Sequence, residues 1–187
     1  MNYTEIINEN IKIDSDLDSL NKKFRNYLEQ VFSPIFVKKI DRVFKKPLQI
    51  ENFKEKTNVM AITDPEGKIY INLDMIKSLP DDRKMVYIIH ELFHVLQKKP
   101  QFRELVQLNN LLGTRTLKFI NEKDINEFLT GKKQDIHSNY KEEFLSYCSN
   151  FAFKWNLAPE LKKIYFDTLS ETGLFNLNSK WWKERFK

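Results

Sequence analysis

Cysteine, glycine and proline are scarce in this chain of 187 residues. Its single cysteine, Cys148, excludes an internal disulfide framework and a structural zinc site built from cysteines. Only four glycines and six prolines occur, which argues against collagen, low-complexity linkers and a turn-rich β-sandwich. No apolar run approaches the ~20 residues that span a bilayer, so we expect no membrane segment. The length predicts one domain over residues 1–187.

We also expect no signal peptide, because the first residues form neither a basic region nor an apolar stretch. With one cysteine, this pattern predicts a reducing, cytoplasmic compartment, and a virion interior would give the same pattern. Aromatic residues, in contrast, are plentiful: fifteen Phe, seven Tyr and three Trp supply surface to bury and argue against intrinsic disorder.

A strong charge bias is absent as well, since 31 Lys and Arg face 26 Asp and Glu, for a net charge of +5. Lysines occur in pairs, for example at positions 22–23, 38–39 and 98–99, but the pairs are scattered and acidic residues lie nearby. No groove-reading motif accompanies them, so a nucleic-acid partner is disfavoured. A basic binding domain would require these pairs to converge on one face.

The N-terminal part, residues 1–46, is predicted to be helical. Apolar residues recur every three or four positions from Leu17, and Pro34 interrupts the pattern before it resumes up to Phe44. Pro47 then ends it. We therefore expect two consecutive helices within Leu17–Phe44.

Residues 47–73 change to a strand pattern. Thr57–Thr63 and Lys68–Leu73 are rich in β-branched residues and flank the turn sequence at 64–67, which predicts a β-hairpin. Leu48–Phe53 is expected to add a third strand to a small antiparallel sheet. Residues 74–187 return to helical patterns, predicted at Asp81–Gln97, Phe102–Ile120, Asn139–Trp155, Pro159–Leu169 and Asn178–Phe186. This order predicts an α+β fold with segregated elements.

The chemistry is concentrated in the motif H-E-x-x-H, formed by His90, Glu91 and His94. Two histidines four positions apart lie on the same helix face, so both imidazoles can reach one metal ion. Glu91, next to the first histidine, is placed to act as general base on a water at the metal. Met85–Gln97 is apolar nearly all round, so this helix is expected to be buried.

The sequence Tyr87–Leu96 resembles the active-site helix of the zincin metallopeptidases. The resemblance implies a zincin-like fold, a catalytic Zn²⁺ and a peptide or protein substrate. It also implies that the strand before the helix, Lys68–Leu73, is an edge strand that pairs with extended substrate.

A catalytic zinc usually has three protein ligands, and the motif supplies two. Position 100 is Pro100 rather than histidine, which excludes the metzincin pattern. The candidates for the third ligand are Glu143, Glu142 and His137. On a helix, Glu143 shares a face with the apolar Tyr147, whereas Glu142 shares one with serines and is expected to meet water.

The residues Glu143–Cys148 resemble the second-helix motif of ImmA/IrrE-like and related phage-borne metallopeptidases. In that family the glutamate binds zinc, so the resemblance implies the gluzincin arrangement with His90, His94 and Glu143 as ligands. His137 and Tyr140 are weaker candidates as donors to the oxyanion of a tetrahedral intermediate.

The sequence therefore predicts a zinc-dependent metallopeptidase of gluzincin type, with Glu91 as its catalytic base. The alternative is a catalytically inactive protein on a zincin scaffold, structural or regulatory in role and of phage or mobile-element origin. Cys148 is expected to be a core residue, and the aromatic cluster from Trp181 to Phe186 is expected to pack against its own domain.

Overall fold

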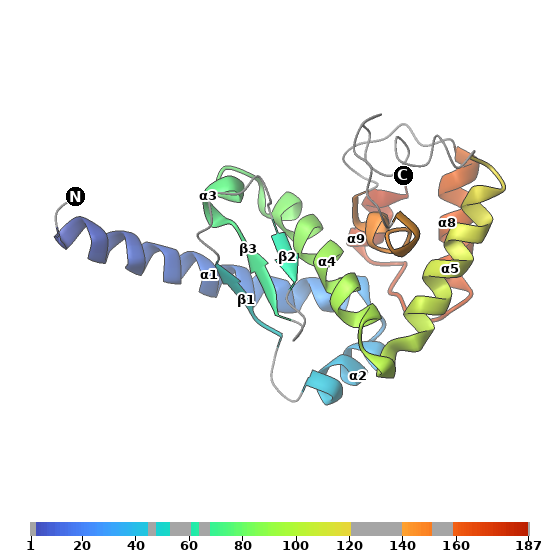
Figure 1. The fold of residues 1–187 in the computed structure, drawn as a ribbon, viewed down its shortest axis with the longest axis horizontal. Helices are drawn as coiled ribbons and strands as arrows, with labels where there is room; N and C mark the ends of the chain where they lie inside the picture. The colour runs from blue at the N-terminus through green and yellow to red at the C-terminus, as the bar shows by residue number, and fades with distance from the viewer. Residues whose placement is uncertain are drawn as a thin grey trace.

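The computed structural model describes residues 3–44, 48–52, 61–63, 68–120, 140–150 and 159–186, with side chains from residue 16 onward except those of 140 and 150. Its fold is mixed α+β and mostly helical, with one small sheet, as the sequence predicts (Figure 1). The elements in chain order are α1 (Tyr3–Val31), α2 (Pro34–Phe44), β1 (Ile50–Asn52), β2 (Ala61–Thr63), β3 (Ile69–Ile71), α3 (Leu73–Ile76), α4 (Asp81–Gln97), η1 (Pro100–Phe102), α5 (Arg103–Leu117), η3 (Tyr140–Glu142), η4 (Ser146–Asn150), α8 (Pro159–Ser170) and α9 (Lys180–Arg185).

The two predicted N-terminal helices are confirmed as α1 and α2. The helical conformation is interrupted between Val31 and Pro34, because proline cannot donate the backbone hydrogen bond of a helix interior. The apolar stripe of α1, including Leu20, Phe24 and Leu28, is buried against the rest of the protein. The helix begins earlier than expected, at Tyr3, and its N-terminal part extends beyond the other elements (Figure 1).

The sheet has the strand order β1-β3-β2, and this corrects two expectations. The hairpin of β2 and β3 is antiparallel as predicted, but β1 pairs with β3 in parallel. Strand β2 runs opposite to both β1 and β3, so the chain has reversed direction twice when it reaches β3, and β1 and β3 run the same way. The expected edge strand is therefore central, with Ile69 and Ile71 fully buried, and β2 is the edge that packs against α4.

Helix α4 is buried, as its apolar pattern predicts, with Ile88, Ile89, Leu92 and Phe93 fully inaccessible. It packs against β2 and β3 on one side and against η4 on another (Figure 1). Two acidic residues open the helix, where carboxylates complement the helix dipole. The motif residues are thus held on a rigid element in the middle of the protein.

The predicted α-helix over Asn139–Trp155 is wrong for the described residues 140–150, which form the 3₁₀ segments η3 and η4 joined by a turn. In an α-helix the Leu145 N–H would donate to the Lys141 carbonyl. Here the Asn109 side chain of α5 stands between them: its Nδ2 donates to the Lys141 carbonyl at 2.6 Å and its Oδ1 accepts from the Leu145 N–H at 2.9 Å. A side chain inserted into the helical ladder breaks it.

The C-terminal aromatic cluster packs against its own chain, as expected, with Trp181 and Trp182 buried. The Trp182 indole N–H donates to the Val31 carbonyl at the end of α1, over 2.8 Å. Cys148 is a buried core residue, which confirms that prediction. Of the helices in the described part of the chain, none combines the length and the apolar character of a membrane-spanning segment.

Candidate metal centre

Helix α4 presents His90 and His94 on one face, one turn apart. Their Nε2 atoms lie 3.2 Å from each other, and their ring centroids are 4.9 Å apart. The two side chains are mostly buried, at 15% and 17% exposure, but still reachable from solvent. This is the arrangement that the i, i+4 spacing of the motif predicts.

Glu143 reaches the two histidines from the turn between η3 and η4. Its Oε2 lies 3.3 Å from the Nε2 of His90 and 3.3 Å from the Nε2 of His94. Glu142, one residue earlier, is exposed at the surface. Of the two candidates for a third ligand that the structure describes, Glu143 rather than Glu142 lies at the histidines, and His137 lies outside the described residues.

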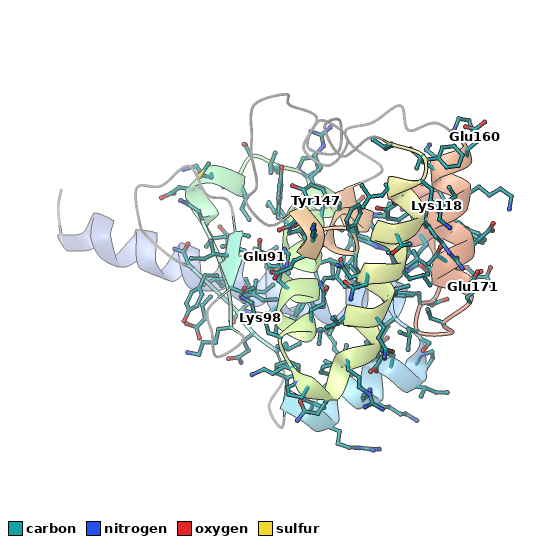
Figure 2. All side chains as sticks on the ribbon, turned by 45° about the vertical axis from the view of Figure 1, so that its right-hand side comes forward. Glu91, Lys98, Lys118, Tyr147, Glu160 and Glu171 are labelled. Atoms are coloured by element: carbon teal, nitrogen blue, oxygen red, sulfur yellow. The ribbon has the colours of Figure 1, made fainter. Side chains whose placement is uncertain are left out.

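Tyr147 supports the same side of the site. Its ring stands edge-to-face against the His90 imidazole, with centroids 5.1 Å apart and planes at 85°. Its backbone N–H also donates to the Glu143 carbonyl over 3.0 Å. The sequence expectation that Glu143 and Tyr147 face the same way is confirmed, although the α-helix on which it relied is not formed. Figure 2 shows Tyr147 on the segment beside α4, the helix that carries Glu91.

The three donor atoms fit a tetrahedral metal ion. They form a nearly equilateral triangle with sides of 3.2, 3.3 and 3.3 Å. Tetrahedral donors about 2.0–2.1 Å from zinc are separated by roughly 3.3–3.4 Å, which is close to these values. Glu143 Oε2 is buried and forms no hydrogen bond with any described residue. When both histidines are neutral and carry their proton on Nδ1, a cation would satisfy the three lone pairs that converge here.

The electrostatics of the group reflect its burial. Burial disfavours the charge of Glu143, but the two adjacent imidazoles outweigh it and hold the pKa of this carboxyl well below its usual range. For His94, desolvation opposes the charge, yet the Glu143 carboxylate overcomes it and raises the pKa of the imidazole. The carboxylate is therefore ionised at neutral pH, the form that binds a metal ion.

Glu91 lies beside this triangle without joining it. It is absent from the group of converging donor atoms, which within the described chain comprises only His90, His94 and Glu143. Burial raises the pKa of the Glu91 carboxyl, and the negative charge of Glu143 acts in the same direction. A carboxylate with raised pKa next to a candidate metal site is suited to accept and return a proton.

The sequence interpretation missed the residue that shapes the turn carrying Glu143, which is Asn109. Its side chain is only 3% exposed and bonds to both sides of the turn. The available signal was a polar residue on the apolar stripe of α5, between Leu105, Leu108 and Leu112. The two expected oxyanion donors, His137 and the Tyr140 side chain, lie outside the described part of the chain.

Comparison of the chain with protein-family models, with curated proteins and with solved structures finds no match.

Proposed function

We propose that the protein is a zinc-dependent metallopeptidase of gluzincin type, with a zincin-like fold. The observation that carries the proposal is the triangle of donor atoms from His90, His94 and Glu143, with edges of 3.2–3.3 Å. Two imidazoles and one carboxylate are a ligand set typical of catalytic zinc, which leaves a fourth position for water or substrate.

When bound, zinc supplies a Lewis acid and lowers the pKa of water toward neutrality. The protein's contribution to hydrolysis then centres on Glu91. Its carboxylate takes the proton from the attacking water and returns it to the leaving amine. Its raised pKa brings it closer to neutral pH, where both transfers are favoured.

Strand β2 is the best candidate for holding an extended substrate. It pairs with β3 on one side, and in the described sheet its other side has no partner strand. It also packs against α4, the helix that carries the motif. A peptide added to this edge would receive backbone hydrogen bonds close to the metal centre.

The test is a Glu91→Gln variant, which keeps the shape of the side chain and removes the base. We expect it to retain zinc and to lose peptidase activity by about 10²–10⁴-fold, the range for a general base. Peptidase assays on a mixed peptide library would measure this, with the exposed Glu142→Gln as matched control. An active Glu91→Gln protein would contradict the assignment of the base.

Wild-type protein that holds zinc but cleaves no peptide would instead favour an inactive scaffold of structural or regulatory role.

A further inference from the structure

Asn109 lies on α5, more than thirty positions before the segment that it contacts. Its Nδ2 donates to the Lys141 carbonyl at 2.6 Å and its Oδ1 accepts from the Leu145 N–H at 2.9 Å. The two bonds use both ends of one planar amide, one donor and one acceptor, and Asn109 is 3% exposed. A buried amide with two short, well-oriented bonds is a fixed structural contact rather than a solvated surface group.

These two backbone groups flank Glu143, two residues before it and two after it. In an α-helix they would bond to each other, and the apolar spacing of the segment favours that helix. The Asn109 amide keeps them apart, so the turn that carries Glu143 adopts a conformation that its own sequence does not specify. The direction of the Glu143 side chain consequently depends on α5.

Gly113 lies one helical turn after Asn109 and faces the same segment. A Cβ atom at this position would lie 2.8 Å and 2.9 Å from two ring atoms of Phe144, closer than side-chain atoms pack. The absence of a side chain therefore lets the residue next to Glu143 lie directly against α5. Asn109 fixes the backbone of the turn, and Gly113 fixes its distance from the helix.

We propose that Asn109 and Gly113 are positioning residues that hold Glu143 Oε2 at the two histidines of α4. This inference rests on the metal-binding part of the proposed function and not on the peptidase activity. Supporting contacts of this kind change metal affinity by about 10–100-fold when they are removed.

The experiment measures zinc affinity of the full chain by competition with a chromophoric chelator. Asn109→Ala is expected to weaken zinc binding by about 10–100-fold. Asn110→Ala, a change of the same residue type at an exposed neighbouring position of α5, is expected to leave affinity within about twofold, as for surface changes. Equal affinity of folded Asn109→Ala and wild type would overturn the proposal.

A double-mutant cycle separates positioning from general loosening of the fold. Glu143→Ala removes the group on which Asn109 acts, so adding Asn109→Ala should cause no further loss of zinc affinity. Losses that add in the double variant would show that Asn109 acts elsewhere.

Gly113→Ala keeps the proposal testable if Asn109→Ala does not fold. It adds one methyl group against Phe144 and should also weaken zinc binding, by a smaller factor than Asn109→Ala. Unchanged affinity in folded Gly113→Ala would exclude it as a positioning residue. Failure of the wild type to take up zinc would overturn the metal site and this inference together, whereas zinc uptake with unaffected variants would overturn this inference alone.

Discussion

At the residue scale, the site is defined by groups that would be costly to bury separately. A carboxylate and two imidazoles, each about 15% exposed, meet within 3.3 Å on the inner face of α4. Without a metal ion, the carboxylate is stabilised by protonated histidine, and with one, all three groups donate lone pairs to the same cation. A proton and the proposed metal ion would therefore compete for His94 and Glu143.

This competition predicts a pH window in the stability of the metal-free protein. The pKa of Glu143 lies below its usual 4.5. Its carboxylate therefore adds to the free energy of unfolding above pH 4.5, and this contribution is lost as pH falls through the lower pKa of the folded state. The pKa of His94 is raised above 6.5. Its imidazolium therefore adds to the free energy of unfolding below pH 6.5, and this contribution is lost as pH rises through the raised pKa of the folded state. Both contributions coexist between pH 4.5 and 6.5.

Glu143→Gln should accordingly destabilise the metal-free protein most within that window, and progressively less at higher pH. Urea unfolding in the presence of a chelator, repeated across pH, would measure the difference in the free energy of unfolding. Glu142→Gln serves as the exposed control and should show no such window. A difference between Glu143→Gln and wild type that increases steadily above neutral pH would contradict the assignment of the ion pair.

At the scale of elements, local pattern predicts helices whose apolar face is continuous. Helix α4 follows from its apolar positions, and its two histidines follow from their spacing. The segment 140–150 does not follow, because a side chain from α5 takes the place of the helical hydrogen bond between Leu145 and Lys141. The sequence still points to Glu143, because one hydrogen bond of α-helical spacing is kept. The Tyr147 N–H donates to the Glu143 carbonyl, so the two side chains remain on the same face.

The sheet shows the same division between local and distant information. The turn and β-branched residues predict the hairpin of β2 and β3, since both strands and their connection are contiguous. The parallel pairing of β1 with β3 depends on which strand lies in the centre, and no local signal states this. Asn109 lies outside sequence reasoning for a similar reason, because its partners are 32 and 36 positions away.

A conformational requirement after α8 gives a further prediction. Gly173 has φ of 64°, in the left-handed region, and no atom lies within 4 Å of the position of a Cβ. Gly173→Ala should therefore cost only backbone strain, about 1–2 kcal/mol in the free energy of unfolding. Urea unfolding would measure it against the exposed Lys183→Ala as control. An equally stable Gly173→Ala protein would show that the turn adjusts without strain.

At the scale of the whole molecule, the C-terminal residues close the core against the N-terminal helices. The side chain of Ser179 donates to the Gln30 carbonyl at 2.6 Å, and Trp182 donates to the Val31 carbonyl at 2.8 Å. Phe175 stacks on Phe32 with ring centroids 5.7 Å apart. The last residues of the described chain are thus part of the structure that supports α1, and α1 in turn contacts α4.

Trp182→Ala should lower the free energy of unfolding by about 3–5 kcal/mol, the usual cost of removing a large buried aromatic side chain. Trp182 is fully buried, whereas the adjacent Lys183 is exposed and its change to alanine should have little effect. Differential scanning fluorimetry and urea unfolding would compare the two variants. A loss below about 1 kcal/mol for Trp182→Ala would mean that the C-terminal contact is dispensable.

The central claim is that His90, His94 and Glu143 bind one zinc ion. The most direct measurement is the zinc stoichiometry and affinity of three full-length proteins: wild type, Glu143→Ala and Glu142→Ala. The wild type and Glu142→Ala should each bind one zinc with matching affinity at neutral pH. Glu143→Ala should bind zinc with an affinity more than about 100-fold lower, a larger loss than removal of a supporting contact causes. A wild type that takes up no zinc, or equal affinities in all three proteins, would contradict the account.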